Sequence, residues 1–289
     1  MTFPPLADWQ TTSLALHQAA MLIGPIHNAL LPSRNNYLHL PLWVEPDGLS
    51  SQRLPQGGQL FVRFKDPAVI YRRLTQADVV FPLHEHTQRS LFEALLKELY
   101  QDELSHFCAG MPTDALTNGM MTKLHANPAR IEFLHLPDVT HTEPLTVNRQ
   151  TASDYADVLY GVYTGVARFR ARLEGPMTPI VVWAEHFDLS TLWFHPENSA
   201  MDDTKPHINI GFAPYSTGQY EQPYLYFYAY PYPPDFTPPQ LPAPAFWHTE
   251  GWQGVVVNYA DIQQQADPIA FVERMCAEVY PLLTGLLGS

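Results

Sequence analysis

The sequence has few basic residues, only two cysteines and no long apolar run, and each shortage excludes a class of protein. Lys and Arg number 16 against 29 Asp and Glu, a formal net charge of −13. This balance argues against nucleic acid and anionic membrane surfaces, because both require clustered basic charge. The two cysteines, Cys108 and Cys276, could pair with each other, but so few do not indicate a disulfide scaffold. No apolar run reaches the ~18 residues of a membrane span, and residues 1–10 do not resemble a signal peptide. We therefore expect a soluble, cytoplasmic protein.

The chain does contain enough apolar residues for a core, together with an excess of proline and histidine. Hydrophobic residues make up 46% of the 289, which supports a sizeable core. Of the 28 prolines, seven lie within residues 231–244, which are therefore predicted to form an extended loop. That loop either covers a sheet or presents a proline motif to a partner. The 13 histidines raise the question of metal or acid–base chemistry.

Hydrophobic periodicity predicts an α+β fold, with antiparallel β-meander sheets and helices packed on one face. Apolar residues at helical spacing predict helices over residues 8–31 with a break at Pro25, 88–104, 151–174, and from 267 toward the C-terminus. Period-two alternation and turn residues predict strands near residues 37–45, 59–64, 68–74, 78–83, 179–187, 189–195, 206–213, 223–230 and 253–259.

We interpret residues 1–289 as a single α+β domain, because helices flank the meanders instead of alternating with each strand. The order helix, meander, helix occurs twice, so the domain also divides into two pseudo-repeated halves, residues 1–104 and 150–289. Residues 105–130 hold Gly, Met and Asn without clear periodicity. They are predicted to be an insertion.

The most informative stretch is residues 223–230, in which tyrosines alternate with apolar residues. Alternation in a strand sends the tyrosines to one face, and residues 206–213 divide in the same way. The polar residues expected on this face are Tyr224, Tyr226, Tyr228, Tyr230, His207 and Asn209. Such a face suits a polar or aromatic small molecule. The alternative is a packing surface covered by the proline-rich loop or by a second copy of the chain.

A second candidate is the segment 183–188. In a continuous strand, His186 and Asp188 would share one side, and Trp183 and Glu185 would share the other. A carboxylate beside an imidazole fixes its tautomer and raises its pKa, as a general base requires. The alternative is a capped or exposed histidine at a strand end. The signatures of P-loop, dinucleotide and nucleophile-elbow sites do not occur.

Several separated segments of the chain form a recognisable set: LPLWVEPDGLSS (40–51), LPQGGQLFVRF (54–64), FRARLEGPMTPIVVW (169–183), FDL (187–189), GFAP (211–214) and FYAYPYPPDF (227–236). On these segments the chain resembles a bacterial family defined only as domain-of-unknown-function family 5996. The resemblance covers most of the chain and implies no established activity. The polar residues that match the family at corresponding positions are His17, Asp188, Tyr228 and Tyr230.

This chain also departs from the family pattern. Relatives carry Gly-Lys where this chain has Gly24-Pro25 and Gly175-Pro176, and tend to arginine at the position of His27. They carry small residues where this chain has Glu185-His186. The resemblance therefore implies a divergent member, which has changed its ligand or has kept the fold without the chemistry.

Three functional hypotheses follow, none of them assigns a cofactor, and metal ligands enter only with the third. The first is a small-molecule-binding protein with catalysis by His186, Asp188 and His207. Its ligand would be bound by His17, Trp183, Glu185, Asn209, Tyr226, Tyr228 and Tyr230. The second is a non-catalytic binding or assembly protein whose tyrosines are buried in a homodimer. The third makes His186, Asp188 and His207 the ligands of one metal ion, because imidazole and carboxylate suit Zn²⁺ or Fe²⁺.

Overall fold

The structure is a computed structural model that describes residues 2–99, 102 and 143–287. The predicted insertion, residues 105–130, lies outside the described residues. Two compact units divide the chain. The N-terminal unit comprises Asp8–Ala156 and Val182–Phe187, and the C-terminal unit comprises Met1–Ala7, Asp157–Val181 and Asp188–Ser289. The grouping of the chain into one domain stays a prediction.

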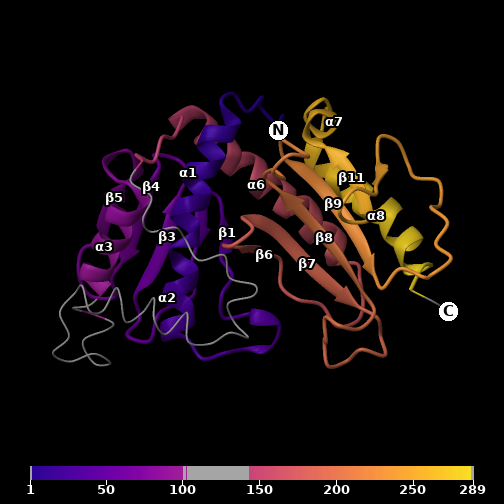
Figure 1. Cartoon of the computed structure of the whole chain (residues 1–289), viewed down its shortest axis with the longest axis horizontal. Coiled ribbons are helices and arrows are strands. Elements are labelled where there is room, and N and C mark those ends of the chain that lie inside the picture. The colour runs from indigo at the N-terminus through magenta and orange to yellow at the C-terminus, as the bar shows by residue number, and fades with distance from the viewer. Residues whose placement is uncertain (1, 100–101, 103–142, 288–289) are drawn as a thin grey trace. The chain divides into compact units, whose positions relative to one another are not determined.

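Two antiparallel sheets and several helices confirm the predicted α+β class (Figure 1). The first part of the chain forms α1 (Trp9–Met21), α2 (Ile23–Leu30), η1 (Asn35–Tyr37), β1 (Trp43–Glu45), β2 (Gly48–Ser50), β3 (Gln59–Arg63), β4 (Ala68–Arg72), β5 (Val79–Pro82), η2 (Leu83–Glu85) and α3 (Gln88–Leu99). The later part forms α6 (Arg149–Arg170), β6 (Val181–Trp183), β7 (Asp188–Phe194), β8 (His207–Ala213), β9 (Tyr224–Tyr230), β10 (Phe246–His248), β11 (Gly254–Asn258), α7 (Tyr259–Gln263) and α8 (Pro268–Thr284).

In the N-terminal unit, β1 to β5 form a meander in chain order, and α1 packs against β3 and α3. The predicted break near Pro25 is confirmed, since α1 ends at Met21 and α2 begins at Ile23. Proline has no amide hydrogen to donate to the carbonyl four residues earlier, so the ladder is interrupted at this point. Among the described residues, no helix has the length and apolar composition needed to cross a membrane.

The predicted strand over residues 37–45 is wrong in its first half. Asn36 and Tyr37 both have a φ of 52°, in the left-handed region, and η1 replaces the strand there. The alternating leucines that suggested a strand are core residues of a non-repetitive segment, with Leu40 and Leu42 buried. Helix α6 also begins earlier than predicted, because the Asn148 side chain accepts a hydrogen bond from the Thr151 amide.

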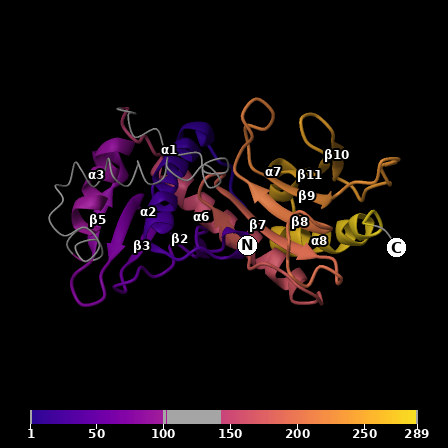
Figure 2. The ribbon, with the colours of Figure 1, turned by 60° about the horizontal axis from the view of Figure 1, so that its bottom comes forward.

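In the C-terminal unit, the six-stranded sheet has the order β10-β11-β9-β8-β7-β6. Helix α8 packs on β8 and β9, and Figures 1 and 2 show it running along the sheet. Helix α6 approaches α8 closely at Gly165, where an added Cβ would lie 2.9 Å from Val272. The residues of β8 and β9 that face these helices are fully buried or nearly so: Ile208, Ile210, Phe212, Leu225, Phe227 and Ala229.

The predicted strand over residues 179–187 is also wrong at its C-terminal end. Strand β6 ends at Trp183, and a tight turn follows in which the Phe187 amide donates to the Trp183 carbonyl at 2.7 Å. Phe187 has a φ of 56°. Because strand alternation does not continue through a turn, the expectation that His186 and Asp188 share a side has no basis in this structure.

Candidate functional site

The tyrosine face is the side of the six-stranded sheet that carries Tyr224, Tyr226, Tyr228 and Tyr230 of β9. The register of β8 and β9 pairs His207 with Tyr230, Asn209 with Tyr228 and Gly211 with Tyr226. Residues paired across an antiparallel ladder project to the same side. The predicted alternation is therefore confirmed for both strands, and the face has two ends of different character.

The packed end of the tyrosine face is organised by Tyr226. An added Cβ at Gly211 would overlap the Tyr226 ring, so this ring lies across strand β8 in the space that glycine leaves. Its hydroxyl reaches β7 and donates a hydrogen bond to the Asp188 carboxylate. Burial raises the pKa of Tyr226 well above its usual value, and the charge of Asp188 adds to the rise. Tyr226 therefore remains a protonated donor whose hydroxyl already has a protein partner.

Further rings complete the packed end. Tyr220 packs against Tyr224 with ring centroids 4.4 Å apart, and Trp252 lies edge-on to Tyr226 at 6.2 Å. Trp252 occupies the space above Gly254, where an added Cβ would overlap its indole. Burial raises the pKa of Tyr224 to about 12. This end is a hydrophobic cluster built from aromatic rings.

His248, at the edge of this cluster, has both ring nitrogens engaged. Its Nε2 lies 2.7 Å from the Glu250 carbonyl, so Nε2 carries the hydrogen in the neutral ring. Nδ1 is then the acceptor for the Tyr220 hydroxyl at 2.8 Å. With its side chain only 8% exposed, His248 serves as a bridge between β10 and the loop that carries Tyr220.

The polar end of the tyrosine face consists of His207, Asn209, Tyr228 and Tyr230. Asn209 is 7% exposed, and its Nδ2 donates to the Tyr228 hydroxyl at 2.9 Å. Its Oδ1 is buried and has no hydrogen-bond partner among the described residues. If the amide were turned over, its nitrogen would face the same position without a partner. In either orientation one end of a buried amide is unsatisfied, which costs about 1–3 kcal/mol.

His207 is held in one tautomer by the backbone. Its Nδ1 donates to the Lys205 carbonyl at 2.8 Å, which leaves the Nε2 lone pair as the acceptor of the neutral ring. Burial lowers the pKa of His207, opposed by the Lys205 carbonyl and by the charge of Asp203. The ring stacks on Tyr230 at 5.3 Å, and Tyr230 is 45% exposed. The polar end therefore combines a neutral imidazole with an accessible phenol.

The other predicted site residues lie in the N-terminal unit. His17, on α1, holds the turn after β6: its Nε2 lies 3.1 Å from the Glu185 carbonyl, and its ring stacks on Phe187 at 5.4 Å. Trp183 supplies the carbonyl that closes this turn. His186 is an exposed residue within the turn. These contacts give His17 and Glu185 a structural role, while the binding role expected for them stays a prediction.

Asp188 was expected to orient a histidine, and that role stays a prediction. Its carboxylate accepts a hydrogen bond from Tyr226, so it orients a phenol. Within the part of the chain that the structure describes, no group of three or more His, Cys, Asp or Glu side chains could hold a metal ion. The assignment of His186, Asp188 and His207 to catalysis stays a prediction.

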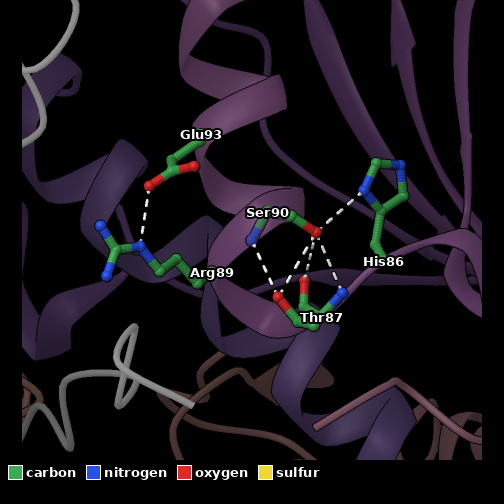
Figure 3. A network of polar contacts seen from close by, with 5 residues as sticks. All are labelled: His86, Thr87, Arg89, Ser90 and Glu93. Carbon is green, nitrogen blue, oxygen red and sulfur yellow. Dashed lines mark hydrogen bonds and ion pairs between the residues drawn. The ribbon is translucent and has the colours of Figure 1, made fainter. Parts of the chain in front are cut away.

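A serine–histidine contact at the start of α3 has a simpler explanation than catalysis. His86 Nδ1 lies 3.2 Å from the Ser90 hydroxyl (Figure 3). That hydroxyl also accepts from the Thr87 amide at 3.0 Å, while the Thr87 hydroxyl accepts from the Ser90 amide at 3.1 Å. Reciprocal bonds of this kind form a capping box. Thr87 is therefore the N-cap of α3, and the Ser90 hydroxyl completes the capping box.

The sequence interpretation missed Gly211, Tyr220, His248 and Trp252. A signal was present for Gly211, because a glycine inside an alternating strand often marks the close approach of a neighbouring side chain. The other three come from a short strand and from loops, where no periodicity links them to β9.

Comparison with known proteins gives one match. A family described as a family of unknown function (DUF5996) matches residues 3–286. No curated protein and no solved structure matches the chain significantly.

Proposed function

Because the chain belongs to this family of unknown function, we propose its function from the site geometry: it binds a small polar molecule at the polar end of the tyrosine face. The residues that would contact the molecule are His207, Asn209, Tyr228 and Tyr230. This narrows the set of ligand-binding residues expected from the sequence, since the Tyr226 hydroxyl already donates to Asp188 at the packed end.

The observation that carries the proposal is the buried Asn209 amide with one unpartnered end. A buried polar atom without a partner is rare in folded proteins and calls for a specific explanation. Leucine at this position would fill similar space without that cost. A ligand that supplies the missing hydrogen bond explains why an amide is present, and the neighbouring phenols provide the ring area that such a ligand needs.

The test is a thermal-shift screen of untagged protein against sugars, acids, amines and aromatic metabolites. A ligand that binds only the folded state raises the unfolding midpoint by mass action, and at a hundred times Kd the stabilisation is about 2.7 kcal/mol. We expect a hit that Asn209→Leu abolishes. Asn258→Ala is the matched control, because it removes an amide at the far end of β11.

Two results would contradict binding at this end. One is a set of ligands that raise the unfolding midpoint of Asn209→Leu as much as that of the unchanged protein. The other is a screen without hits combined with a homodimer that light scattering finds dissociated in Tyr228→Ala. That second result would favour assembly through the tyrosine face.

A further inference from the structure

Two side chains at the polar end, Asn209 and His207, present hydrogen-bond acceptors. Asn209 has used one N–H on Tyr228 and presents an unpartnered Oδ1. His207 donates its only N–H to the Lys205 carbonyl, so its Nε2 is an acceptor. Asn209 Oδ1 and His207 Nε2 are therefore two acceptors, and a ligand group that meets either of them must be a hydrogen-bond donor.

Charge adds a second constraint. The carboxylates of Asp188 and Asp203 both act on Tyr228, where burial first and then these two charges raise the pKa of the phenol. Asp203 acts in the same way on His207. The nearby Lys205 ammonium lies 3.9 Å from the Asp202 carboxylate, so the positive charge of Lys205 is partly neutralised. The carboxylates that act on these rings thus outnumber the one nearby ammonium, so these charges disfavour an anionic ligand.

The aromatic rings provide a third constraint. Tyr230 is 45% exposed, and its ring stacks on His207. Tyr228 lies edge-on to His207 with centroids 6.1 Å apart. The faces of phenol rings carry partial negative charge and attract cations within about 6 Å. Rings and carboxylates thus favour the same sign of ligand charge.

The side chains beside Asn209 determine how a ligand reaches its amide. The cross-strand neighbours of Asn209 are Leu192 on β7 and Tyr228 on β9. Both side chains are partly exposed. Asn209 thus has a partly exposed side chain on each side, and a rotamer change of Leu192 is the motion that we expect to open a path to Asn209 Oδ1.

We infer that the ligand of the polar end carries a protonated amine. Its ammonium group would donate a hydrogen bond to Asn209 Oδ1 and lie against the rings of Tyr228 and Tyr230, with the Asp203 carboxylate nearby. This inference rests on the proposed function and specifies its ligand class. Both the unpartnered Asn209 Oδ1 and the charges of the Asp188 and Asp203 carboxylates support it.

A matched series of three probes tests the charge: benzylammonium, benzyl alcohol and benzoate, which share a ring and differ in charge. Each is titrated into ¹⁵N-labelled protein and followed by amide chemical shifts. We expect benzylammonium to bind about tenfold more tightly than benzyl alcohol, with shifts centred on β8 and β9, and benzoate to cause none. Asn209→Leu should weaken benzylammonium binding about tenfold, and Asn258→Ala should leave it unchanged.

The outcomes separate the inference from the proposed function. If benzyl alcohol or benzoate binds the polar end as well as benzylammonium does, the amine inference is wrong and the binding site stands. If no probe shifts β8 or β9, and the metabolite screen also fails there, both are wrong. Asp203→Asn should weaken benzylammonium about threefold at low salt and less at high salt, because its carboxylate is exposed. Equal binding in that variant at low salt would contradict the charge argument.

Discussion

The two ends of the tyrosine face use the same residue type for different purposes. At the packed end, Tyr226 lies over Gly211 and donates to Asp188, so its polar atom is satisfied within the protein. At the polar end, Tyr228 accepts from Asn209, and the other end of that amide has no partner among the described residues. Strand alternation places all four tyrosines together. Their roles depend on the neighbouring strands.

Because of this difference, we expect the packed end to contribute to stability and the polar end to contribute to ligand binding. A satisfied buried hydrogen bond stabilises the fold, whereas an unsatisfied buried acceptor reduces stability until a partner supplies a donor. The packed end should therefore respond to substitution through the free energy of unfolding. The polar end should respond through ligand affinity.

The largest expected effect on stability is a loss in acid caused by His27, a residue of the N-terminal unit. Because His207 at the polar end also responds to acid, the two responses must be measured separately. Burial lowers the pKa of His27 to about 4, and its Nε2 has no hydrogen-bond partner among the described residues. The unfolded chain binds this proton below pH 6.5, and the folded chain binds it only near pH 4. Stability is thus complete above pH 6.5, and about 3 kcal/mol is lost as the pH falls to 4.

Urea denaturation between pH 4 and 7 measures this loss. His27→Gln, which keeps a donor for the Leu40 carbonyl, should flatten the curve, and the exposed control His84→Gln should not. Benzylammonium affinity should still fall toward the acid end of this range in His27→Gln, because burial lowers the pKa of His207 and only the protonated ring repels a cation. An affinity that is constant over this range would remove His207 from the site.

The next effect tests the packing of Tyr226. Gly211→Ala should lower the free energy of unfolding by about 2–3 kcal/mol, because the new methyl group overlaps the Tyr226 ring and displaces its hydroxyl from Asp188. Gly24→Ala is the control, since an added Cβ there meets nothing within 4 Å. Wild-type stability in Gly211→Ala would show that the ring does not lie across β8.

A crossed pair of substitutions compares the two ends directly. Tyr226→Phe removes the hydroxyl that donates to the partly buried Asp188 carboxylate and should cost about 2 kcal/mol of stability, with benzylammonium affinity unchanged. Asn209→Leu should change stability by less than about 1 kcal/mol, because it removes an unsatisfied acceptor. Calorimetric unfolding and titration of both proteins give the comparison. Equal losses of stability and affinity in both variants would show that the face acts as one unit.

The sequence predicted the parts of this arrangement that depend on local pattern. The alternation in β8 and β9 placed the tyrosines, His207 and Asn209 on one face, and helix periodicity located α1, α2, α3, α6 and α8. Strand pairs and amphipathic helices repeat along the chain, so their faces can be read from residue spacing.

The parts that depend on distant contacts could not be predicted in this way. The turn before Asp188 is stabilised by His17, which is 168 residues away from Glu185 in sequence. Asp188 accepts a hydrogen bond from Tyr226, and that bond requires glycine at position 211 on the strand between them. Spacing alone made His186 the neighbour of Asp188, because it assumed a strand where Phe187 adopts a left-handed conformation.

The most direct test of the central claim is the side-chain amide signal of Asn209 in a ¹⁵N–¹H spectrum, assigned by its loss in Asn209→Leu. We expect benzylammonium to shift this signal at concentrations that leave the Asn258 side-chain amide unchanged. An Asn209 signal that does not respond, while other parts of the spectrum do, would contradict the claim that this amide is the binding group.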